Sequence, residues 1–74
     1  MEYDPNKTFS PLNADKVTVG SKGYFADSVK DLKWKVKHNA LTMKIIRINE
    51  YAEYPFYVHD FVQPFRYFYL VQEA

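Results

Sequence analysis

Catalytic side chains are few in this sequence, and their spacing does not suit catalysis. His38 and His59 are the only histidines, and cysteine is absent. Asp60 follows His59 directly, and because successive side chains of a strand point to opposite faces, the two are expected to point apart. No serine stands in a nucleophile elbow, and no residues have the spacing of a metal site. We therefore expect no enzyme activity, no catalytic residue, no metal and no cofactor.

Trp34 is the residue best suited to binding another molecule. In a helix it is turned about 200° from Leu32, away from the apolar stripe and toward lysines. Such a Trp can stack on a base, fill a pocket of a partner protein, or lie over lysine stems beneath the N-terminal residues. The alternative to a protein-binding surface is a nucleic-acid surface made of Lys22, Lys30, Lys33, Trp34 and Lys37.

The segment NEYAEYPF is the second candidate surface, because two glutamates alternate in it with two tyrosines. Glu50, Tyr51, Glu53 and Tyr54 offer carboxylates beside flat rings, which can oppose a basic, base-stacking groove. Pro55 stiffens the segment and lowers the entropy lost on binding. We predict a protein-binding site made of these four residues and Trp34, with an ordinary acidic turn as the simpler alternative.

The stretch KGYFA has the residue types of an RNA-reading strand but not their order. Tyr24 and Phe25 are adjacent and point to opposite faces, whereas base stacking needs alternating aromatics on one face. We predict instead a hairpin turn at Gly20 and Gly23, with one of the two aromatic side chains buried.

The elements that position these residues follow from alternation, periodicity and turn residues. Within the most β-like stretch the alternation slips at Ile45-Ile46, which predicts a bulge or a strand covered on both sides. A helix with Asp27 or Ser28 as its N-cap is predicted to end near His38-Asn39, with Leu32 and Val36 on its apolar stripe. The predicted strands are 16–19, 24–26, 41–49, 56–61 and 66–72.

This β-β-α-β-β-β order predicts an α+β fold with one amphipathic helix. The sheet is expected to be small, twisted and antiparallel, or to form an SH3-like partly closed barrel. Because a chain of 74 residues buries only one small core, residues 16–74 are predicted to form a single domain. Residues 1–15, which contain two prolines, are predicted to form an N-terminal arm pinned by Phe9 and Leu12.

The last predicted strand is rich in aromatic residues, and nine of the fourteen aromatics follow residue 50. Tyr67, Tyr69 and Val71 alternate with Phe68 and Leu70. If only one face of this strand meets the core, the other presents an aromatic patch. Self-association through the C-terminal strand is therefore a further prediction.

Charge and composition indicate the cellular setting. Between residues 16 and 47 seven lysines and one arginine stand against two aspartates, although the net charge of the chain is only +1. This uneven distribution can steer a charged partner. No stretch approaches the ~20 apolar residues of a membrane span, and a chain without cysteine suits a reducing compartment. We expect a cytoplasmic protein without a membrane contact.

The stretches NADKVTVGSKGYFADSVKDLKWKV and PFRYFYLV resemble short accessory proteins of unassigned function encoded by phages and mobile elements of low-GC Gram-positive bacteria. The resemblance covers most of residues 13–71 and includes no catalytic motif. It implies a compact protein that binds and disables a host enzyme, CRISPR nucleases included, or that assists virion or transcription functions. We therefore expect an anti-CRISPR-like protein-binding module that inhibits or modulates a host protein. Nucleic-acid binding and a structural role in assembly are the alternatives.

Overall fold

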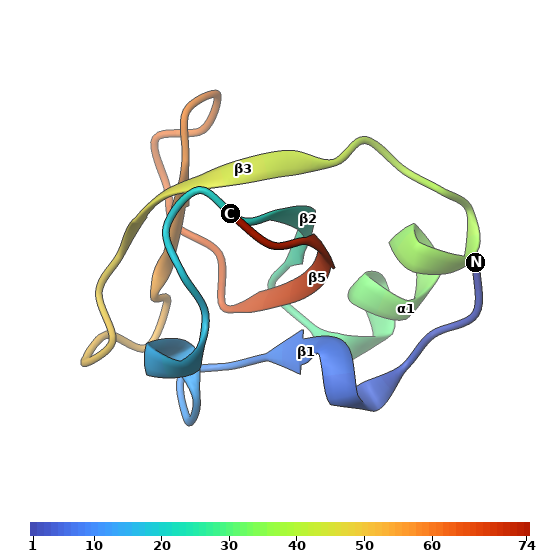
Figure 1. Cartoon of the computed structure of the whole chain (residues 1–74), viewed down its shortest axis with the longest axis horizontal. Coiled ribbons are helices and arrows are strands. Elements are labelled where there is room, and N and C mark those ends of the chain that lie inside the picture. Colours follow the sequence, from blue (N-terminus) through green and yellow to red (C-terminus); the bar gives the residue numbers. More distant parts are fainter.

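One α-helix packs against a five-stranded antiparallel sheet in the computed structural model, which describes all residues from 1 to 74 (Figure 1). The strands are β1 (Thr8–Phe9), β2 (Lys22–Ala26), β3 (Met43–Ile48), β4 (Phe56–Val58) and β5 (Tyr67–Gln72), and the helix is α1 (Val29–Lys37). Two short 3₁₀ helices, η1 (Pro5–Lys7) and η2 (Ala14–Lys16), lie in the N-terminal part. The order of strands across the sheet is β1-β5-β2-β3-β4.

The predicted α+β class is confirmed, and the sheet is open, with β1 and β4 as its edges. The predicted order of elements is also right, but the first strand is made by other residues. Residues 16–19, predicted as a strand, end η2 and enter a turn in which the Ser21 N–H donates to the Thr18 carbonyl over 3.1 Å. Gly20 has a φ of 98°, and this left-handed conformation ends any extended run there.

Residues 1–15, predicted as an arm, supply the edge strand β1. Its two residues pair with Phe68 and Tyr69 of β5, so β5 lies between β1 and β2 and its edge is occupied at these residues. Phe9 packs against the core as predicted. Leu12 is 96% exposed and anchors nothing, so that part of the prediction is wrong.

Both faces of β2 and β5 are buried. Tyr24 and Phe25 are 3% and 1% exposed, whereas the sequence predicts that only one of them is buried. Phe25 belongs to a cluster with Phe68 on one face of the sheet, and Tyr24 belongs to a cluster with Tyr69 and the helix on the other. Because Phe68 and Tyr69 are 0% and 1% exposed, they contribute no aromatic patch to the surface.

Local sequence signals explain α1. The Asp31 N–H donates to Ser28 Oγ over 3.1 Å, which caps the first turn. Leu32 and Val36 lie one turn apart, are fully buried and pack in the cluster that contains Tyr24. The predicted helix is therefore confirmed, with Ser28 as its N-cap and His38 directly after its last residue.

The predicted slip in β3 is a β-bulge. Ile45 pairs with Val58 and Arg47 pairs with Tyr57, so the register shifts between these two pairs. Because of the bulge, Ile45 and also Ile48 at the end of β3 pack into the core. It leaves Ile46 and Arg47 next to each other on the exposed face of the strand.

Lys35 differs from the other lysines of α1 because it has a structural role. Its Nζ donates to the Phe25 carbonyl over 2.6 Å and lies 5.6 Å from the centre of the Phe65 ring. We expect Lys35→Met, which keeps the aliphatic stem, to lower the free energy of unfolding by about 1–2 kcal/mol through loss of this charge-assisted bond. Urea unfolding of this variant and of the exposed control Lys30→Met measures the difference. Equal stability of the two variants would show that the bond contributes nothing.

Candidate functional site

The outer face of α1 carries Lys30, Lys33, Trp34 and Lys37, which we call the α1 face. Each of these residues has two others of the set three or four positions away, and all lie opposite the buried stripe, so they share one side of the helix. Trp34 is 59% exposed, and its ring centre lies 4.5 Å from that of His38 one turn later. The N-terminal residues therefore do not cover Trp34, and the contact with His38 restricts its orientation.

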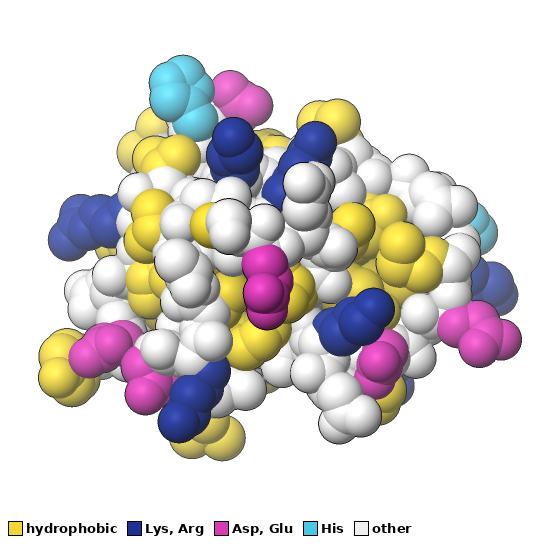
Figure 2. All heavy atoms as spheres, viewed as in Figure 1, with side chains coloured by type: hydrophobic (Ala, Val, Ile, Leu, Met, Phe, Trp, Pro, Cys, Tyr) yellow, Lys and Arg dark blue, Asp and Glu magenta, His cyan; other side chains and the backbone are white.

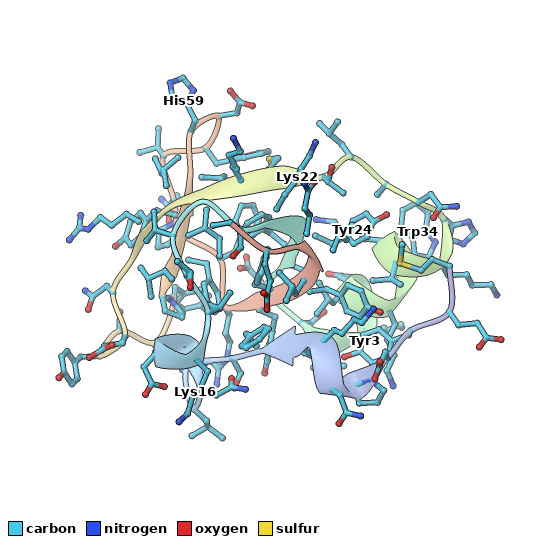
Figure 3. The ribbon with its side chains drawn as sticks, viewed as in Figure 1. Tyr3, Lys16, Lys22, Tyr24, Trp34 and His59 are labelled. Carbon is cyan, nitrogen blue, oxygen red and sulfur yellow. The ribbon has the colours of Figure 1, made fainter.

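A groove of about 450 Å³ runs beside the α1 face. It is lined by Met1, Glu2, Tyr3, Lys33 and Lys37. The Lys33 Nζ lies 5.4 Å from the centre of the Tyr3 ring, and this ring lies 5.4 Å from that of Tyr69 in β5. The N-terminal segment thus forms a wall on the β1 side of the helix (Figure 3).

Lys22 does not join the other predicted nucleic-acid residues. It lies on β2 directly opposite Lys44 of β3, and Figure 3 places it next to β3 and apart from Trp34. The structure therefore brings together four of the five residues predicted for a nucleic-acid surface and separates the fifth.

The predicted acidic and aromatic loop connects β3 to β4. Its turn is closed by two backbone bonds, from the Asn49 N–H to the Pro55 carbonyl (2.9 Å) and from the Ala52 N–H to the Asn49 carbonyl (3.0 Å). Tyr51 is 92% exposed and Tyr54 is 39% exposed. The loop thus presents at least one tyrosine on an ordered turn, as predicted.

The negative charge of this loop is partly neutralised. Glu53 Oε1 accepts a hydrogen bond from Arg66 Nη1 over 2.9 Å. Interaction with the Tyr67 side chain, and then with Glu53, raises the pKa of Arg66 above its ordinary value, so the guanidinium stays charged. Glu50 is exposed and forms no ion pair. Of the two predicted carboxylates, therefore, only Glu50 is unpaired.

The loop and the α1 face lie at opposite ends of the molecule. In Figure 1 the gold segment between β3 and β4 is at the left, whereas α1 is at the right, along the longest axis. A groove of about 390 Å³ with Asp15, Arg47 and Tyr51 among its lining residues lies at the loop end. The predicted protein-binding residues thus form two separate surfaces.

Sequence reasoning missed a third surface, on the half of the sheet that α1 leaves uncovered. The helix packs on β2 and β5. Beyond it lies what we call the sheet strip, which consists of Lys22, Lys44, Ile46, Arg47 and Tyr57. Arg47 Cζ lies 4.9 Å from the centre of the Tyr57 ring. Figure 2 shows basic side chains close together at the top of the view, over β3. The signal in the sequence was the pair of basic residues around the predicted bulge.

His59 and Asp60 do not point apart as predicted. The strand predicted over 56–61 is β4 in the structure and ends at Val58, so both residues lie in the turn that follows. There His59 Nδ1 and Asp60 Oδ1 are 3.4 Å apart. Their side chains are 89% and 73% exposed. No cluster of three or more side chains of His, Asp or Glu is placed to hold a metal ion. No helix has the length and apolar character that crossing a membrane requires.

The α1 face, the loop and the sheet strip are therefore candidate surfaces that rest on the geometry of this structure alone. Comparison of the chain with protein-family models, curated proteins and solved structures finds no match.

Proposed function

We propose that this protein is a non-enzymatic binding module that attaches to another protein through the α1 face. The observation that carries the proposal is Trp34, 59% exposed on a helix whose other side is fixed in the core. Tryptophan is among the residues that contribute most to protein interfaces. Because the helix is already ordered, binding through it loses little conformational entropy.

The charge of the α1 face indicates the chemistry of the partner. Lys30, Lys33 and Lys37 surround Trp34, and none of them forms an ion pair. A partner with an apolar pocket for the indole and acidic side chains around it would match this surface. The groove beside Tyr3 can receive a side chain of the same partner.

One stable interface with a partner protein does not need both the α1 face and the loop. A stable interface takes about 800 Å² from each partner, which is about a sixth of the 5013 Å² exposed by this chain. The same interface would have to extend along the longest axis to include the loop at Tyr51. We therefore centre the proposal on Trp34.

The resemblance to accessory proteins of phages and mobile elements supports a host protein as the partner, in the cytoplasm. Inhibition or modulation of that host protein, a CRISPR nuclease included, is the corresponding biological role. An SH3-like scaffold for this surface stays a prediction. A second protein-binding surface at the loop is favoured by Tyr51, which is 92% exposed on an ordered turn.

Trp34→Ala is expected to weaken binding to the host partner by at least about 2 kcal/mol, or roughly 30-fold. Capture of proteins from a lysate of a low-GC Gram-positive host by the tagged chain, with and without nuclease, identifies the partner. Titration of that partner with the wild-type chain and the variant then gives the two affinities. Thermal unfolding of the variant should be nearly unchanged, because the side chain is largely exposed.

Leu12→Ala is the matched control, since Leu12 is a 96% exposed apolar residue outside all three surfaces. It should bind the partner like the wild-type chain. Equal binding by Trp34→Ala and Leu12→Ala would remove the α1 face from the proposal. Capture that disappears with nuclease would replace the protein partner by nucleic acid.

A further inference from the structure

The sheet strip contains two lysines that face each other without a counter-charge. Lys22 and Lys44 are directly opposite partners on β2 and β3, and both are exposed. Like charges in this position destabilise a pair of strands. Neither lysine belongs to either of the ion pairs of the molecule. An anion bound between them would remove the repulsion and gain two charged contacts.

A groove of about 330 Å³ lies at these lysines. Besides Lys22 and Lys44 it is lined by Gly20, Gln72, Glu73 and Ala74. Glu73 is the one acidic residue there, and it is exposed and not within ion-pair distance of either lysine. The groove therefore offers two free ammonium groups to a phosphate-sized group.

Arg47 and Tyr57 extend the strip with a flat, cationic surface. The bulge turns Arg47 to the exposed side of β3, and its guanidinium lies over the Tyr57 ring at 4.9 Å. A guanidinium held against a ring is planar and weakly hydrated, and its free side can stack on a base. Ile46, 51% exposed, provides an apolar contact beside it.

We propose that the sheet strip binds single-stranded nucleic acid, with Lys22 and Lys44 on phosphates and a base stacked at Arg47 and Tyr57. Lys44 and Arg47 are three residues apart on an extended strand, roughly 10 Å along it. Cations in line with a planar stacking surface on a sheet are the arrangement by which proteins bind unpaired strands. An acidic protein surface would use the lysines but would have no need of the stacked arginine.

This site is independent of the proposed protein-binding surface. The groove beside the α1 face lies on the β1 side of the helix, where Tyr3 contacts Tyr69 of β5. The sheet strip lies on the β3 and β4 side. One molecule could therefore hold a protein and a nucleic-acid strand at once. If the experiment on one proposal contradicts it, the other proposal is unaffected.

Fluorescence anisotropy with labelled oligothymidine and oligouridine of about 20 nucleotides tests the proposal. Each phosphate neutralised on a single strand contributes about 0.7 to the slope of log K against log salt, so the two lysines on phosphates should give a slope of roughly −1.4. In Lys44→Ala with Arg47→Ala the slope should fall to roughly −0.7, and the affinity at about 50 mM salt should fall at least tenfold. Arg47→Lys keeps the charge and should keep the slope, but it should bind more weakly because the planar group is lost.

The charge-matched control is Lys7→Ala with Lys16→Ala, which removes the same two charges from exposed positions outside the strip. It should bind like the wild-type chain. Three results would overturn the proposal: no binding at low salt, an equal loss in the strip variant and the control, or a loss found only in Lys30→Ala with Lys37→Ala on the α1 face. Complete competition by inorganic triphosphate, together with an unchanged oligonucleotide affinity in Arg47→Lys, would also overturn it. The site would then bind small anions without stacking on a base. All variants are compared by thermal unfolding, and the exposed positions should leave the melting temperature nearly unchanged.

Discussion

Gly23→Ala is expected to leave the protein largely unfolded at 25 °C. A Cβ at this position of β2 would lie 1.8 Å from the carbonyl oxygen of Tyr69 and 2.9 Å from Cε1 of Phe68. The carbonyl belongs to the backbone of the neighbouring strand, so it cannot yield unless β2 separates from β5. A loss above about 4 kcal/mol is expected from such an overlap. This is comparable with the whole stability of a chain of this length, about 4–11 kcal/mol.

The measurement is far-UV circular dichroism with urea unfolding, and Gly20→Ala is the control. Gly20 has a φ of 98°, but a Cβ there would meet only the Ala74 Cβ at 3.2 Å. Its substitution should lower the free energy of unfolding by about 1–2 kcal/mol, from backbone conformation alone. If Gly23→Ala were as stable as Gly20→Ala, the close approach of β2 to β5 described above would be wrong.

Phe68→Ala is expected to lower the free energy of unfolding by about 3–5 kcal/mol. Phe68 is 0% exposed, and its ring centre lies 6.2 Å from that of Phe9, 4.8 Å from that of Phe25 and 5.8 Å from that of Phe56. These rings come from β1, β2 and β4, so removal of Phe68 leaves a cavity where three strands meet. The surrounding strands are paired and cannot close it fully.

Guanidinium unfolding of Phe68→Ala measures this loss, with Phe61→Ala as the control of equal chemistry. Phe61 is 51% exposed and contacts one other ring, that of Phe65, at 5.4 Å. Its removal should lower the free energy of unfolding by no more than about 1 kcal/mol. A loss in Phe68→Ala as small as that in Phe61→Ala would mean that the core does not depend on the junction of these strands.

The features that were predictable from the sequence are those set by neighbouring residues. Ser28 caps α1 because the Asp31 N–H lies three residues away, and Leu32 and Val36 are buried because they share one side of a helix. The bulge in β3 was predictable from the slip in alternation at Ile45. Helical geometry turned Trp34 away from the apolar stripe, whereas its exposure also depended on the path of the N-terminal residues, which the sequence left open.

The features that escaped prediction depend on residues far apart in the chain. Thr8–Phe9 became a strand because Phe68 and Tyr69 offered an edge to pair with, while the alternating residues 16–19 had no such partner. Burial of both Tyr24 and Phe25 required a helix on one face and a second aromatic cluster on the other.

The candidate surfaces also divide into features set by neighbouring residues and features that depend on residues far apart in the chain. The α1 face was predictable from helical spacing, but the separation of Lys22 from it depends on strand register with Lys44. The stacking of Arg47 on Tyr57 and the pairing of Glu53 with Arg66 also join different elements. No local pattern in the sequence encodes such contacts.

The place of β5 determines when the molecule can fold during synthesis. β5 is the last strand in the sequence, yet it lies between β1 and β2, and its Phe68 and Tyr69 belong to the two separate clusters. Until residues 67–72 have left the ribosome, neither cluster can close, and β1 and the edge of β2 that faces β5 stay unpaired. Unpaired strand edges are the sites at which incomplete chains aggregate or are held by chaperones. Folding therefore waits for one late, long-range step, and its rate is limited by the joining of distant parts of the chain.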